Sequence, residues 1–230
     1  RNRLLVSIAA VVVLAVVSWF FYNDAISFMR GPYCHFVHLH PEKSLGRSCH
    51  LYFTGPLEGF STRLKVCMYG GIALSSPVLF YEFWRFVNPA LKKNEKRYAF
   101  PFVASATVLF AMGVTTAVLV FPKALTWLID VSGRGVVPLF TPTRYFTLYV
   151  AMCVIFGAIF MYPLVLVSLE LIGVVPSARW RKWRRPAILV IAVVAAVITP
   201  SSDPFSFAAM AIPMYLFYEG SIAVGRMLGK

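Results

Sequence analysis

The segment CHFVHLHPEKSLGRSCH, residues 34–50, gathers all four histidines of the chain with two of its four cysteines. Thiolate and imidazole groups are preferred ligands of zinc and copper, so the residue types suit a metal site. Their spacing, however, matches no CxxC or HxxxH pair. Two cysteines in an oxidising compartment more often form a disulfide, worth roughly 3 kcal/mol for a loop of this size. We therefore predict a disulfide between Cys34 and Cys49, with a metal site as the alternative.

The segment LKKNEKR, Leu91–Arg97, places Glu95 among four basic residues. One interpretation is a solvated acid that forms weak surface ion pairs, each contributing about 0–1 kcal/mol. The other is a carboxylate at a membrane surface that receives a guanidinium in bidentate geometry. The residue types alone favour the first interpretation.

The other acids avoid the middle of the long apolar runs, where a charge would usually serve ion transport. Glu58 follows Thr54 and Pro56 at the start of such a run, which suits an acid in a first helical turn facing the helix dipole. Because the sequence also contains no Ser/His/Asp set, nucleophile elbow, Walker loop or HExxH motif, we predict that the chain is not an enzyme and uses no cofactor.

The composition predicts an integral membrane protein. Hydrophobic residues make up 59% of the 230 positions and charged residues 13%, whereas soluble domains average about 45–50% and about 25%. The net charge of +13 is concentrated in short loops between apolar runs. The positive-inside rule explains this pattern, so no nucleic-acid partner is expected.

A spanning helix needs about 20 mostly apolar residues. We predict one all-α membrane domain over residues 1–230 with six helices, the last two short, separated on the outer side by loops 23–59, 129–144 and 199–204. The run from Leu4 to Tyr22 lacks a small-residue cleavage site, so we expect a span there and not a cleaved signal peptide. Pro77 is expected to kink the second helix, and Pro101 and Pro163 to interrupt the third and fourth. The predicted helices are 4–22, 60–87, 98–128, 145–175, 186–198 and 205–224.

Charge predicts the orientation. Most of the 22 basic residues fall at the two ends of the chain and in the loops near residues 91–97 and 179–185. The richer side is cytoplasmic, so both termini and Glu95 are expected in the cytoplasm, and Cys34 and Cys49 outside. The protein is accordingly expected in the cell membrane.

Several segments resemble TatC, the multispanning subunit of the twin-arginine protein translocase, and they cover the chain in order. The longest, SSPVLFYEFWRFVNPALKKNEKR, resembles the second helix and first cytoplasmic loop of the family. The others are RNRLL, TGPLEGF, FGAIFMYPL and TPSSDPFSFAAMAIPMYLFYE.

The resemblance implies a receptor and scaffold that binds twin-arginine signal peptides and moves folded proteins across the membrane with energy from the proton gradient. The resemblance implies that Glu95 contacts the arginine pair of the signal peptide. This replaces the interpretation of Glu95 as a solvated surface acid, which the residue types alone favour. We expect Phe86, Pro89 and Leu91 to shape the loop, with Arg1 at the same site. In the family, a segment with a glutamate before R-x-R-L also joins this site. The sequence opens at Arg1, so we expect weakened recognition.

The resemblance also implies six helices in a cupped shape, with single-span TatA-type and TatB-type partners docking near the last two. Membrane lipid surrounds the helices, and self-association is left open. Met161 stands where the family commonly has a glutamate, and Phe207 stands at a glutamine-like position. Thr199 is the remaining polar candidate for partner docking. Pro32, Glu58, Asp203 and Pro204 are expected as structural residues of the outer loops.

Two other classes of protein remain as alternatives. A small-solute secondary transporter or channel would show inverted repeats and paired broken helices, which are not visible in the sequence. A membrane thiol oxidoreductase using Cys34 and Cys49 would need a reactive, CxxC-like pair, and a separation of 15 positions argues for a structural bond instead.

Overall fold

The computed structural model describes residues 2–39, 49–87, 99–131, 140–171, 180, 183–199 and 203–227. All regular secondary structure within these ranges is helical, as the sequence predicts. The helices are α1 (Asn2–Phe20), α2 (Tyr22–Leu39), α3 (Glu58–Val87), α4 (Ala99–Val131), α5 (Pro142–Phe160), α6 (Tyr162–Leu171), α8 (Arg184–Ile198) and α9 (Pro204–Met227).

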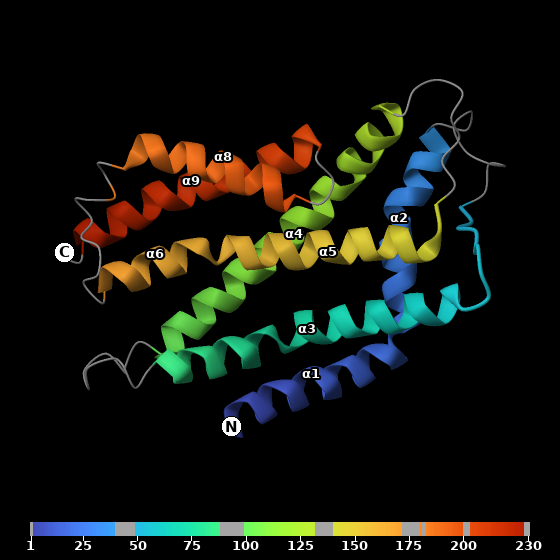
Figure 1. Cartoon of the computed structure of the whole chain (residues 1–230), viewed down its shortest axis with the longest axis horizontal. Helices are drawn as coiled ribbons and strands as arrows, with labels where there is room; N and C mark the ends of the chain where they lie inside the picture. Colours follow the sequence, from blue (N-terminus) through green and yellow to red (C-terminus); the bar gives the residue numbers. More distant parts are fainter. Residues whose placement is uncertain are drawn as a thin grey trace.

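Most of the helices lie roughly side by side, and α4 crosses them diagonally (Figure 1). α1 packs along α3, α4 packs on α5, and α8 and α9 form a hairpin beside α6. The end of α3, the start of α4, the end of α6, the start of α8 and the end of α9 lie on the left of Figure 1. The start of α3, the end of α4 and the start of α5 lie on the right. The chain therefore runs back and forth between two faces.

The loop predicted over residues 23–59 is wrong in its first half, because residues 22–39 form α2. α2 bends by 76° from α1, and it crosses the right-hand ends of α3 and α5 in Figure 1. Tyr33, Phe36 and Val37 are buried in the core, and Tyr22 and Ile26 pack against it. Pro32, expected in a loop, lies inside this helix. The segment is too polar to resemble a span, yet its apolar residues recur at helical spacing.

The three prolines that are expected to kink or interrupt helices have different effects in the structure. The span predicted over 145–175 breaks at Met161, where α5 ends and α6 begins, two residues before Pro163. Proline lacks the N–H that would continue the helical hydrogen bonds, so the break agrees with the expected interruption. The expectation for Pro101 is wrong, because it lies in the first turn of α4, where proline is tolerated. α3 continues through Pro77 without a break in the helix.

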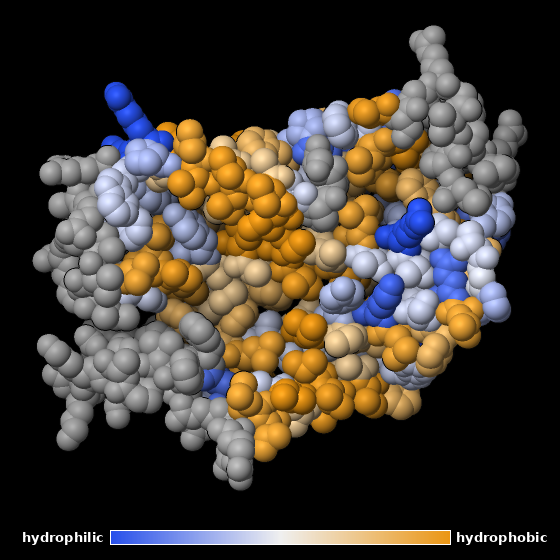
Figure 2. Space-filling model, in the orientation of Figure 1, coloured by the Kyte–Doolittle hydropathy of each residue, from blue (hydrophilic) through white to orange (hydrophobic). Residues whose placement is uncertain are grey.

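Three helical segments are long and apolar enough to cross a membrane: Glu58–Glu82, Phe102–Val131 and Pro142–Leu169. The bent pair α1 and α2 raises this number to four if it counts as one span. Figure 2 shows a broad apolar region through the middle of the molecule, with hydrophilic residues toward its upper left and its right-hand side. The described part of the chain is therefore a membrane-spanning helical protein.

Close helix contacts depend on glycine. A Cβ atom at Gly113 of α4 would lie 2.5 Å from the carbonyl oxygen of Phe156 in α5. A Cβ atom at Gly71 of α3 would lie 2.7 Å from the backbone nitrogen of Ala15 in α1. Small residues allow backbones to approach closely where helices associate in lipid. These two contacts set the spacing of α1, α3, α4 and α5.

Candidate functional site

Most of the residues predicted to bind a signal peptide lie outside the described residues. This is true of Arg1, Pro89, Leu91 and Glu95. Phe86 lies in the last turn of α3. Glu95 lies between α3 and α4 in the sequence, and the end of α3 and the start of α4 lie together on the left of Figure 1.

The residues predicted to dock a partner helix occupy three different environments. Phe207 lines an apolar groove of about 300 Å³ between α8 and α9. Thr199 ends α8 and is only 4% exposed. Met161 lies at the break between α5 and α6. The groove is lined by Ile188, Ile191, Ala192, Phe207, Ala211, Ile212, Tyr215 and Leu216.

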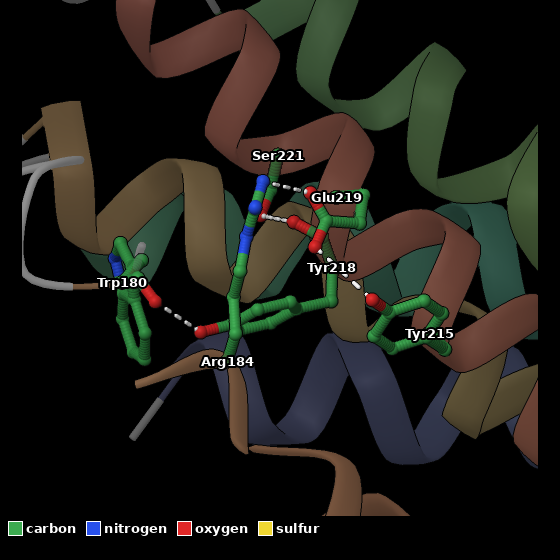
Figure 3. A network of polar contacts seen from close by, with 6 residues as sticks. All are labelled: Trp180, Arg184, Tyr215, Tyr218, Glu219 and Ser221. Carbon is green, nitrogen blue, oxygen red and sulfur yellow. Dashed lines mark hydrogen bonds and ion pairs between the residues drawn. The ribbon is translucent and has the colours of Figure 1, made fainter. Parts of the chain in front are cut away.

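A polar network joins the start of α8 to the last turns of α9 (Figure 3). Arg184 donates to the Oε2 atom of Glu219 at 2.6 Å, and the Tyr215 hydroxyl donates to Oε1 of the same carboxylate at 3.3 Å. On the same stretch of α9, the Tyr218 hydroxyl donates to the carbonyl oxygen of Trp180 at 2.5 Å. Both partners of the ion pair are partly exposed, so the network closes one end of the helical hairpin without burying a charge.

The opposite end of the same hairpin is held by Asp203. Its carboxylate accepts a hydrogen bond from the Ser206 backbone N–H at 2.7 Å, and the residue is 1% exposed. Pro204 follows as the first residue of α9. An acidic N-cap followed by proline at the first helical position is a strong helix start. The two residues predicted to hold this turn thus begin α9.

Glu58 joins the starts of two helices. Its Oε2 atom accepts hydrogen bonds from the Thr54 backbone N–H at 2.7 Å and from the Thr54 hydroxyl at 3.0 Å. The carboxylate also bonds to Thr141 and Thr143 at the start of α5. A carboxylate here satisfies donors that no helical carbonyl can reach. The expected first-turn acid is present, and its contacts extend to a second helix.

Cys34 and Cys49 come together in the fold. Both are free thiols in the structure, and their side chains are hydrogen-bonded to each other. The extended segment after Cys49 is attached to the start of α5, because the Tyr52 N–H donates to the carbonyl oxygen of Phe140 at 3.3 Å. The disulfide stays a prediction. Within the described ranges, which leave out His40, no three His, Cys, Asp or Glu side chains converge as metal ligands.

Sequence reasoning did not single out the groove or the network at its end. The pair Tyr215 and Glu219 has the four-residue spacing that places side chains on one helix face. That spacing was a usable signal. The contact of Arg184 with Glu219 joins residues 35 positions apart, and only the folded hairpin brings them together.

These features define a class of protein: a membrane-spanning helical protein with a helical hairpin that presents an apolar groove. The family model described as Sec-independent protein translocase protein (TatC) matches residues 1–213, and the chain belongs to this family. Proteins of the same description from Frankia casuarinae and Escherichia coli K12 are 37% and 32% identical to it. The alignments cover 98% and 100% of this chain, and 63% and 86% of those proteins. The chain thus spans about three fifths of the Frankia protein.

The fold agrees with the family. A crystal structure of the twin-arginine translocase receptor TatC in DDM superimposes with a TM-score of 0.78 at 30% identity. The match covers 98% of this chain and 96% of that one. A second crystal structure of the same receptor gives a TM-score of 0.76.

Proposed function

We propose that the chain is the signal-peptide receptor and scaffold of a Sec-independent translocase that moves folded proteins across the cytoplasmic membrane. The match to the TatC family over nearly the whole chain carries this proposal, and the fold likeness to a twin-arginine translocase receptor supports it. The protein performs no catalytic chemistry of its own in this proposal. The proton gradient supplies the energy for transport.

Glu95 receives the arginine pair of the signal peptide. A carboxylate binds a guanidinium through two parallel hydrogen bonds, whereas an ammonium offers only a point charge. This geometry discriminates Arg-Arg from Lys-Lys. Phe86, at the end of α3, together with Pro89, Leu91 and Arg1, shapes the surface around the carboxylate.

Single-span TatA-type and TatB-type subunits dock in the groove between α8 and α9. The groove is open and apolar over most of its length, and it suits a hydrophobic helix. Association of helices in lipid depends largely on van der Waals packing. Phe207 contributes apolar surface to this contact, which replaces the polar contact that the family resemblance implies at the same position.

The proposal places both termini in the cytoplasm and counts six spans. α8 has 15 residues and is roughly 22 Å long, whereas the hydrocarbon core is about 30 Å thick. The bilayer therefore thins locally beside α8. The prediction of a short last helix is wrong, because α9 has 24 residues and is long enough to span the core. An unperturbed bilayer beside these helices in cryo-electron microscopy of nanodiscs would contradict this part of the proposal.

The first test is photocrosslinking of a twin-arginine signal peptide to the full-length protein in membrane vesicles. We expect strong crosslinking that falls when Glu95 is replaced by Ala and when Lys-Lys replaces Arg-Arg in the peptide. Asp24→Ala is the matched control, because Asp24 is an exposed acid in the first turn of α2. Equal crosslinking by all variants and both peptides would show that Glu95 does not bind the arginine pair.

A further inference from the structure

The groove between α8 and α9 has one polar side chain among the described residues that line it. Seven of the eight lining residues are aliphatic or Phe, and the eighth is Tyr215. A hydroxyl group on an otherwise apolar wall in lipid is a point at which an incoming helix gains a hydrogen bond. Tyr215 is therefore the residue at which this groove can recognise a polar group.

The Tyr215 hydroxyl is held in place and still has hydrogen-bonding capacity. It donates a hydrogen bond to the Glu219 carboxylate, and Arg184 on the facing helix pairs with the same carboxylate. A phenol hydroxyl that donates one hydrogen bond can still accept others through its oxygen lone pairs. Because Arg184 pairs with Glu219, the carboxylate charge near the hydroxyl is balanced, and the site suits a neutral donor better than a cation.

We propose that Tyr215 is the polar contact for the docked partner helix and accepts a hydrogen bond from a neutral amide or hydroxyl side chain on it. Glu219 and Arg184 act as positioning residues that fix the Tyr215 hydroxyl. This inference rests on the docking of a single-span subunit in the groove, as proposed above. It adds the chemical nature of the contact with that subunit and the position of the contact along the groove.

The proposal sets the register of the partner along the groove. Tyr215 follows Phe207 by two helical turns on α9, which corresponds to roughly 12 Å along the helix axis. Phe207 stands where the family resemblance implies a polar residue. The polar side chain of the partner therefore lies about two turns farther from the start of α9 than a contact at Phe207 would place it.

Thr199 does not compete for this role in the described structure. Its hydroxyl is buried without a hydrogen-bond partner among the described residues, and the residue does not line the groove. The residue is only 4% exposed, so a partner helix does not reach it in this arrangement. Tyr215 is half-buried and lines the groove directly.

The test uses the full-length chain co-expressed with its TatB-type subunit, with photoreactive benzoylphenylalanine at Ile188 to report groove occupancy. Tyr215→Phe keeps the ring and removes the hydroxyl, and we expect it to lower the crosslink yield about three- to tenfold. Tyr81→Phe is the matched control, because Tyr81 is 50% exposed on α3 and lies outside the groove. We expect the control to leave the yield unchanged.

A second measurement reads the register, which a purely structural role of Tyr215 would not change. A single Gln is moved along the partner helix, and the position of highest crosslink yield is found. With the double variant Phe207→Gln and Tyr215→Phe, we expect the best position to shift by about two turns toward the start of α9.

The two proposals fail differently. If the groove crosslinks form but neither Tyr215→Phe nor the double variant changes yield or register, the role of Tyr215 is wrong while docking stands. If benzoylphenylalanine at Ile188 crosslinks no TatB-type subunit in the native chain, docking in the groove is itself wrong, and the inference is overturned with it.

Discussion

The hydroxyl oxygens of Thr62 and Thr143 lie 2.6 Å apart and join α3 to α5, although 81 residues separate them in the sequence. Both hydroxyls also lie within hydrogen-bond distance of the Glu58 carbonyl oxygen, at 2.8 Å from Thr62 and 3.4 Å from Thr143, and either hydroxyl can donate to the other. Thr62 is 2% exposed. This contact links the starts of two neighbouring helices beside the cap that Glu58 provides.

Replacing Thr143 by Val should lower the free energy of unfolding by about 1 kcal/mol, because it keeps the shape and removes an interhelical hydrogen bond. Thermal unfolding in detergent measures this change. Thr115→Val is the control, since the Thr115 hydroxyl bonds only to the Ala111 carbonyl of its own helix. Equal Tm values for the two variants would show that the contact between the helices contributes nothing.

Gly113 should not tolerate a side chain. In Gly113→Ala the new Cβ atom would meet the backbone of Phe156 and Gly157 in α5, and α4 and α5 would have to separate. We expect a loss of about 1–3 kcal/mol in the free energy of unfolding. Gly220→Ala is the control in α9, where no atom lies within 4 Å of the added Cβ. A Gly113→Ala protein as stable as the control would contradict the close packing of α4 on α5.

Cys34 and Cys49 should be joined in the protein isolated from membranes without reductant. Their side chains already touch, and exchange with a protein or small-molecule disulfide would remove two electrons and two protons from the thiol pair. Maleimide labelling after denaturation should then detect two thiols, Cys67 and Cys153, and four after reduction. Four labelled thiols without reductant would exclude the disulfide. Bond cleavage by mild thiols in the folded protein would instead favour a redox role.

Arg63 should stabilise the bend between α1 and α2. Its guanidinium carbon lies 4.2 Å from the ring centroid of Trp19 and 5.0 Å from that of Tyr22, and it donates to the Trp19 carbonyl oxygen at 3.2 Å. Arg63→Met should remove about 1 kcal/mol of stability and increase amide hydrogen exchange around residues 19–22. Arg63→Lys keeps the charge but loses the planar stacking, so we expect an intermediate result. Unchanged exchange in Arg63→Met would show that the bend does not depend on this side chain.

Asp203 should stabilise α9 through the hydrogen bond that its carboxylate accepts from the Ser206 N–H. Asp203→Ala should cost about 0.5–2 kcal/mol in the free energy of unfolding, because the Ser206 N–H loses its acceptor. Asp203→Asn retains a side-chain oxygen and should remain close to native stability. Urea unfolding in mixed micelles compares the two variants. Equal destabilisation by Asn and Ala would indicate that the negative charge, and not the hydrogen bond, is required.

The sequence predicts the membrane class, the helical content and most helix positions, because apolar runs of spanning length depend only on local composition. α4, for example, extends from Ala99 to Val131, close to the prediction of 98–128. The prediction fails for α2, whose Tyr33 and Phe36 are buried although the helix is too polar to be recognised as a span. Its stability comes from packing against α4, α3 and the start of α5, which composition does not encode.

Some of the candidate sites can also be recognised in the local sequence, whereas others form only when distant helices pack together. Glu95 stands out in the sequence because an acid among bases is unusual, and the capping roles of Glu58 and Asp203 follow from local spacing. The Arg184–Glu219 pair, the contact of Cys34 with Cys49 and the groove wall around Tyr215 exist only after distant helices pack together. Local sequence determines which residues can bond. Tertiary packing decides which of them meet, because helix contacts in lipid depend on close fit between whole surfaces.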